Sequence, residues 1–273
     1  MAATFFVVPQ WQGSDSSRAM RLVDGAEAIR GDLPAAATVT VEVPSEAGSD
    51  EGSGVQRLSA LRAIRDAQLA AMHGAAGLPI TIGGDCGVAL GAIESAARED
   101  ERLAVVWFDA HPDLNTPDSS RHGAFTGMTL RTLLGDGASA LVPAVPISAD
   151  RVILAGARSF DDAESDYLAS APIVGLTPED LDAESITEAL RRSGATSVYL
   201  HIDVDVLDPA ELAGVGDPIP FGLSLPQLLE AITAARSLLP LAGAGISGFA
   251  PSSPEAAADD LGAILRIVGA LTR

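Results

Sequence analysis

Short apolar runs alternate with helix-length segments along the chain. The runs are mostly continuous and rich in β-branched residues, as expected of strands that are buried on both faces. They cover residues 4–9, 37–44, 77–84, 102–110, 150–157, 171–176, 197–206 and 243–251. Apolar residues recur at helical spacing in residues 55–75, 127–137, 185–195, 224–239 and 259–272, and an Ala-rich helix follows Cys86. This alternation predicts an α/β fold with a mostly parallel central sheet and helices on both faces.

The length of 273 residues fits one large domain, predicted to span residues 1–273. Residues 44–54, "PSEAGSDEGSG", form the clearest expected surface loop, which is too short to divide two domains. The first residues have no basic segment before their apolar stretch, so we interpret them as a strand and not as a signal peptide. A single cysteine cannot form an internal disulfide, and we therefore expect a cytoplasmic protein.

The chain is strongly acidic, with 37 Asp and Glu, 17 basic residues and a net charge of −20. This charge disfavours nucleic acid and anionic membranes as partners and attracts cations, although most of it also serves as a solvated surface. No apolar run approaches the roughly 20 residues of a membrane span. Every basic residue is Arg, which excludes Schiff-base chemistry on a lysine and a P-loop lysine.

Polar clusters follow the apolar runs where a parallel sheet gathers its ligands, at the carboxyl ends of the strands. Asp109, His111 and Asp113 alternate in "FDAHPDLN", so an extended backbone would aim all three in one direction. Asp203 and Asp205 repeat this spacing, and two aligned carboxylates repel each other unless a cation lies between them. Either stretch alone could be a solvated loop; the presence of both favours a metal site.

Four carboxylates and an imidazole suit a hard or borderline divalent ion such as Mn²⁺. They are too many for one catalytic ion that keeps an open position. The set therefore predicts two ions, bridged by shared aspartates and a hydroxide that acts as the nucleophile.

The motifs "IGGDCG", "DAHPDLNTP", "GARSFDDAE", "DVDVLDP", "FGLSLPQLLEAI" and "GFAPSSPE" occur in an order that resembles the ureohydrolases, which include arginase and agmatinase. The resemblance implies the three-layer arginase-type α/β fold and a site for two Mn²⁺. It also implies that Asp109 and Asp203 bridge the ions. Asp113 would bind the first ion and orient the hydroxide, and His111 and Asp205 would complete the second.

Three positions depart from the family pattern. Cys86 stands where the family usually has a histidine ligand of the first ion, so we expect a ligating thiolate; the alternative is a buried thiol. The acid/base histidine of arginases corresponds to His122 if the loop is shortened, or to Thr126 in the gapless alignment that we favour. Gly248 stands where many arginases have a Glu that binds the guanidinium group. A guanidinium would therefore lose its carboxylate partner here, unless Asp217 takes over that role.

Recognition of an amino-acid end is implied by three other matches. Asp161 and Glu164 stand where arginases receive the α-ammonium group, and Asn115 matches the residue that meets the α-carboxylate. Asp161 and Glu164 would otherwise be part of a solvated loop.

A site that recognises an amino acid but lacks a carboxylate partner for the guanidinium should prefer an N-hydroxyguanidine, which is less basic than a guanidine. The combination of Cys for His, no aligned acid/base His and no Glu resembles arginase-like enzymes that act on hydroxyarginine. This resemblance implies hydrolysis of the guanidino amino acid Nω-hydroxy-L-arginine to hydroxyurea and L-ornithine; the residues alone predict a two-metal hydrolase of C–N bonds. The alternatives are a conventional arginase or agmatinase, and a degenerate metal-binding protein without activity. The chain ends at Arg273 without the extension that supports some arginase trimers, so a monomer is expected.

Overall fold

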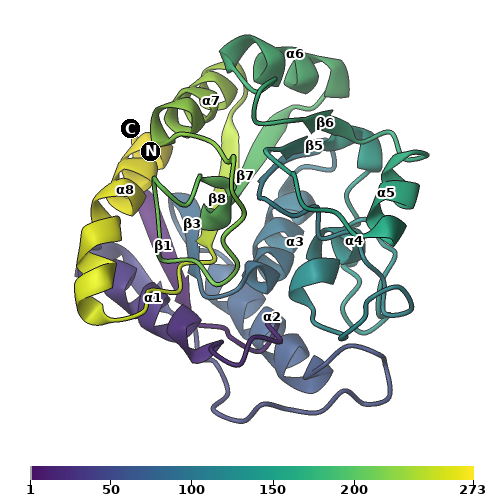
Figure 1. The fold of residues 1–273 in the computed structure, drawn as a ribbon, viewed down its shortest axis with the longest axis vertical. Helices are drawn as coiled ribbons and strands as arrows, with labels where there is room; N and C mark the ends of the chain where they lie inside the picture. Colours follow the sequence, from purple (N-terminus) through teal and green to yellow (C-terminus); the bar gives the residue numbers. More distant parts are fainter. Residues whose placement is uncertain (1) are drawn as a thin grey trace.

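Eight parallel strands form one sheet in the computed structural model, which describes residues 2–273 (Figure 1). The spatial order is β2-β1-β3-β8-β7-β4-β5-β6. The strands are β1 (Ala3–Val8), β2 (Thr38–Thr40), β3 (Leu78–Gly83), β4 (Leu103–Phe108), β5 (Val152–Ala155), β6 (Val174–Leu176), β7 (Ser197–Asp203) and β8 (Leu241–Ser247). Each predicted strand is present, although most are shorter than the apolar run that predicted them.

Helices cover both faces of this sheet and complete the predicted three layers (Figure 1). They are α1 (Met20–Gly31), α2 (Leu58–Met72), α3 (Ala89–Glu99), α4 (Thr129–Leu133), α5 (Asp162–Leu168), α6 (Ala183–Ser193), α7 (Leu225–Leu238) and α8 (Pro254–Thr272). One core joins α1, α6, α7 and α8 to one face of the sheet, and a second joins α2, α3 and α4 to the other. The predicted fold class is confirmed.

Successive strand residues contribute to opposite cores, which explains why the strands have no polar face. In β4, Val106 and Phe108 belong to the first core, whereas Val105 and Trp107 belong to the second. The sequence pattern missed α1 and α5. Only four residues of α1 are buried, and α5 has only seven residues, most of them polar, so neither shows a strong apolar period.

The four central strands place the polar motifs at one edge of the sheet. β3, β8, β7 and β4 are neighbours, and because they run in parallel their carboxyl ends meet at the same edge. The segments that begin at Gly84, Asp109, Val204 and Gly248 follow these ends. Residues 45–52 are exposed, in agreement with the predicted loop. None of the helices in residues 2–273 is long and apolar enough to cross a membrane.

Candidate metal centre

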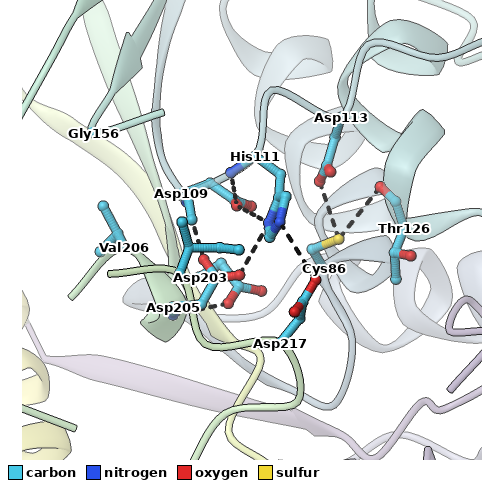
Figure 2. A network of polar contacts seen from close by, with 12 residues as sticks. Cys86, Asp109, His111, Asp113, Thr126, Gly156, Asp203, Asp205, Val206 and Asp217 are labelled. Atoms are coloured by element: carbon cyan, nitrogen blue, oxygen red, sulfur yellow. Dashed lines mark hydrogen bonds and ion pairs between the residues drawn. The ribbon is translucent and has the colours of Figure 1, made fainter. Parts of the chain in front are cut away.

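The segment after β4 does not continue as an extended chain. The strand ends at Phe108, and Asp113 has a φ of +51°, a left-handed conformation that Asp tolerates better than most residues. The expectation that an extended backbone aims Asp109, His111 and Asp113 together is therefore wrong. Asp113 instead turns toward Cys86, while Asp109 and His111 remain together (Figure 2).

The segment after β7 departs from an extended chain in a similar way. Residues Val204–Val206 form a 3-10 turn, and Asp203 is its N-cap, with Oδ1 accepting the N–H of Asp205 at 3.1 Å. Asp203 Oδ2 accepts a hydrogen bond from Ser247 Oγ at 3.1 Å. The turn, and not a continuing strand, orients Asp205.

A first group of potential metal ligands consists of Asp109, His111 and Asp205. His111 Nδ1 lies 3.5 Å from Asp109 Oδ1 and 3.1 Å from Asp205 Oδ2 (Figure 2). The N–H of Ala110 donates to Asp205 Oδ1 at 3.0 Å and fixes that carboxylate. Burial alone would lower the pKa of His111, but the two carboxylates raise it to about 12. The two carboxylates therefore strongly favour a positive charge at this position.

A second group consists of Asp109, His201 and Asp203, and all three side chains are buried. His201 Nε2 lies 3.8 Å from Asp109 Oδ2, while the ring stacks on Trp107 with centroids 3.6 Å apart. Burial lowers the pKa of His201, which favours the neutral imidazole that binds metals. Asp109 thus belongs to both groups, each of which has its three ligand atoms within 4.8 Å of one another.

Cys86 and Asp113 pair beside these groups. Cys86 Sγ lies 3.1 Å from Asp113 Oδ2, and Cys86 follows Asp85 directly at the end of β3 (Figure 2). Burial, followed by the charge of Asp113, raises the pKa of the Cys86 thiol. A thiolate at this position therefore needs a cation beside it.

Asp85 anchors the cavity wall. Its carboxylate accepts hydrogen bonds from Gln10 Nε2 and from the N–H groups of Gly13 and Gly87, which ties residues 10–13 to the Cys86 turn.

The buried carboxylates lack enough positive charge among the described side chains. Asp109, Asp113 and Asp203 are 2%, 4% and 7% exposed. Burial and neighbouring carboxylates raise the pKa of Asp113 and of Asp203 well above the usual range. Divalent cations among these oxygens would remove this conflict, and carboxylates with imidazole are ligands that such ions accept. The residues therefore fit a metal centre.

A cavity of about 730 Å³ opens above this centre. Its wall holds the residues predicted to receive an amino acid. Asn115 Nδ2 donates to Asp161 Oδ2 at 2.9 Å, and both side chains line the cavity. Glu164 also lines it but is only 5% exposed. Its two oxygens accept the N–H groups of Leu114 and Asp161, so Glu164 joins two loops.

Asp217 and Gly248 line the cavity beside the two groups of potential ligands. The Asp217 side chain is 81% exposed and reaches to 3.9 Å from His111 Nε2 (Figure 2). Gly248 has a φ of +83°, and a Cβ there would lie 2.0 Å from Asp203 Oδ1. A larger residue at position 248 therefore requires a different local backbone, which separates this site from one with an acidic residue in that place.

The two candidate acid/base positions occupy different parts of the cavity. Thr126 lies beside Cys86, with its carbonyl oxygen 3.5 Å from Sγ (Figure 2). His122 is exposed at the rim, and its carbonyl accepts a hydrogen bond from Gln56 Nε2.

Arg158 links the second turn to the loop that carries Asp217. Its guanidinium donates to the carbonyl oxygens of Asp205 at 2.8 Å and of Ile219 at 2.7 Å. Further bonds reach the carbonyl oxygens of Gly156, Val206, Leu207 and Pro220.

His201 is not among the ligands predicted from the sequence. One signal was available, because His201 stands two residues before Asp203 and thus on the same face of a strand. Its immediate neighbours in the strand are apolar, however, and a lone histidine there has the same spacing as a core residue.

An all-parallel sheet with a buried carboxylate–imidazole cluster at its central strand ends is typical of an α/β protein with a candidate metal centre. The arginase family model matches residues 18–267, and the chain belongs to the arginase family. It is 35% identical over 155 residues to the arginase of Bacillus subtilis (strain 168), a match that covers 54% of this chain and 52% of that one. The aligned stretch thus spans about half the length of this curated relative.

Solved structures match over nearly the whole chain. The arginase of Entamoeba histolytica in complex with L-ornithine has a TM-score of 0.87 at 24% identity, covering 98% of this chain and 97% of that one. The proclavaminate amidino hydrolase of Streptomyces clavuligerus has a TM-score of 0.72 at 21% identity, covering 99% and 90%. At this identity the likeness establishes the fold.

Proposed function

We propose that the chain is an amidinohydrolase with two Mn²⁺ ions that hydrolyses a C–N bond of a guanidino amino acid. The observation that carries this proposal is the presence of two ligand groups joined at Asp109, beneath a cavity of about 730 Å³. Such a pair of ions, when bound, supplies an ionised water as nucleophile near neutral pH. Membership of the arginase family supports the same reaction class.

The chain's own residues hold the ions and orient the reactants. Asp109 and Asp203 would contact both ions, Cys86 and Asp113 the first, and His111 and Asp205 the second. Asp113, whose Oδ2 lies 3.1 Å from Cys86 Sγ, would orient the attacking water.

Asn115 and Asp161, held together at 2.9 Å, would receive the amino-acid end of the substrate. Glu164 would act there chiefly through its bonds to the backbone of Asp161 and Leu114.

We propose Nω-hydroxy-L-arginine as the substrate, with hydroxyurea and L-ornithine as products. Position 248 offers no carboxylate to a guanidinium, and its conformation leaves little space for one. An N-hydroxyguanidine is less basic, so it needs less carboxylate partnering. It also brings an oxygen and a proton to the site, which suits a cavity without the usual acid/base histidine, as the favoured gapless alignment of Thr126 implies.

The replacement of the family's usual His and Glu at positions 86 and 248 resembles the arginase-like enzyme that acts on this substrate in D-cycloserine biosynthesis. On the basis of this resemblance, the proposed setting is antibiotic biosynthesis. We also propose that the protein is cytoplasmic and monomeric.

The test is a parallel assay of the Mn²⁺-loaded protein on hydroxyarginine, arginine and agmatine, with ornithine or putrescine as the measured product. We expect the highest kcat/KM for hydroxyarginine. Equal values for hydroxyarginine and arginine would favour a conventional arginase, and better turnover of agmatine would contradict recognition of an α-carboxylate. No turnover of any of the three would refute the proposed function.

The exposed His122 provides a control within the same cavity. We expect His122→Ala to retain kcat, because an essential acid/base residue contributes about 10²- to 10⁴-fold. A loss of that size would identify His122 as the acid/base and refute the gapless alignment.

A further inference from the structure

We propose that His201 is a metal ligand, supplying an imidazole nitrogen to the first ion, on the side of Asp109 opposite His111. The inference rests on the proposed two-metal function but concerns a residue outside the ligand set implied by the family resemblance. It makes His201 and His111 equivalent nitrogen donors on the two sides of Asp109.

The first observation is the state of the His201 side chain. It is fully buried, and neither of its ring nitrogens has a hydrogen-bond partner within residues 2–273. Buried polar atoms in proteins nearly always have a partner, and one without a partner is costly. The carboxylate of Asp109 lies near the unpaired Nε2 but beyond hydrogen-bond distance.

The second observation is the distance between these groups. His201 Nε2 and Asp109 Oδ2 lie 3.8 Å apart, which is too long for a hydrogen bond. It matches two ligands of one ion, since donors at about 2.1 Å from a metal lie roughly 3–4 Å from each other. The ligand atoms of Asp109, His201 and Asp203 are all within 4.8 Å of one another.

The third observation is how Asp109 divides its two oxygens. Oδ1 faces His111, 3.5 Å away, while Oδ2 faces His201. Each side then has one imidazole and one further aspartate, Asp205 or Asp203. A carboxylate placed between two such groups has the arrangement of a bridging ligand.

The strands explain why His201 keeps this position. His201 pairs with Trp107 in the register of β7 and β4, and the two rings stack at an interplanar angle of 19°. Asp203 ends β7 two residues after His201, and Asp109 directly follows the end of β4, two residues after Trp107. The stack therefore holds the imidazole directly beneath the two carboxylates.

The experiment compares Mn²⁺ binding to metal-free wild type and to His201→Leu by calorimetric titration. We expect two ions per chain in the wild type, and at least tenfold weaker binding of one ion in His201→Leu. Urea unfolding of the metal-free variant should occur at the same or a higher midpoint, because two unpaired buried nitrogens are removed. Tyr199→Phe, on the same face of β7, is the control and should bind both ions as the wild type does.

Unchanged affinity for both ions in a folded His201→Leu would overturn the inference. If that variant does not fold, His201→Gln is titrated in the same way with the same expectation. A crystal structure of the Mn²⁺-loaded wild type gives a direct reading: Nε2 at about 2.0–2.3 Å from an ion supports ligation, and a distance beyond about 3 Å refutes it.

The assays separate this inference from the proposed function. Ligation by His201 without turnover of guanidino amino acids would refute the function alone, whereas turnover with full metal binding by His201→Leu would refute the ligand alone.

Discussion

Substituting Gly248 by Ala should disrupt the metal centre, although it adds only one methyl group. The new Cβ would lie 2.0 Å from Asp203 Oδ1 and 2.6 Å from its Cγ. These atoms cannot remain in place at such distances. Since the backbone at Gly248 has a φ of +83°, the methyl group also occupies a conformation that L-residues avoid.

The size of the effect follows from these contacts. The left-handed backbone costs an L-residue about 1–2 kcal/mol. Displacing the Asp203 carboxylate also endangers its hydrogen bonds with Ser247 Oγ and the N–H of Asp205, each worth about 1 kcal/mol. We therefore expect Gly248→Ala to lower the free energy of unfolding by about 2–4 kcal/mol.

The assay is urea unfolding of the metal-free protein together with Mn²⁺ content by elemental analysis. Gly262→Ala is the matched control, because Gly262 lies within α8 and a Cβ there meets no atom within 4 Å. This control should stabilise the protein by about 0.5–1 kcal/mol, as alanine does in place of glycine inside a helix. The two variants thus have opposite expected signs. Wild-type stability and full metal content in Gly248→Ala would refute the argument from the close approach to Asp203.

Two further predictions concern residues that support the site or the sheet. Arg158→Lys should weaken Mn²⁺ binding about tenfold in a calorimetric titration. A lysine cannot reproduce the planar guanidinium that donates hydrogen bonds to the carbonyl oxygens of Asp205 and of Ile219 in the Asp217 loop. Unchanged binding would refute this role of Arg158. Asp100 accepts a hydrogen bond from Ser197 Oγ at 2.6 Å, which, with other bonds, holds its pKa below the usual range. The stabilisation that the Asp100 carboxylate contributes is present above about pH 4 and is lost as the pH falls through its lowered pKa in the folded state. Asp100→Ala should therefore reduce the melting temperature less in acid than at neutral pH. An equal reduction at both pH values would contradict this assignment.

The layers of the fold were predictable because strands buried on both faces must be apolar throughout. Residues 102–110 and 197–206 therefore stood out as strands, and their polar ends indicated which edge of the sheet carries chemistry. Helices α1 and α5 were not predictable in this way, since few of their residues face the core.

The geometry at the strand ends was less accessible. The spacing of Asp109, His111 and Asp113 is consistent with an extended segment, but the positive φ of Asp113 depends on tertiary contacts such as the bond from the Arg131 N–H to its carbonyl. The environment of His201 likewise depends on the register with β4, which local periodicity does not reveal.

The stack between Trp107 and His201 gives the protein an optical probe beneath its cavity. The chain has two tryptophans, and the other, Trp11, lies under the guanidinium of Arg57 at 5.0 Å from the ring centre. Trp107 has no solvent exposure, and its nearest aromatic neighbour is the imidazole 3.6 Å away. Its fluorescence therefore depends on the electronic state of His201. A Trp11→Phe protein would have Trp107 as its single tryptophan, so its tryptophan fluorescence would report on His201 without any attached label.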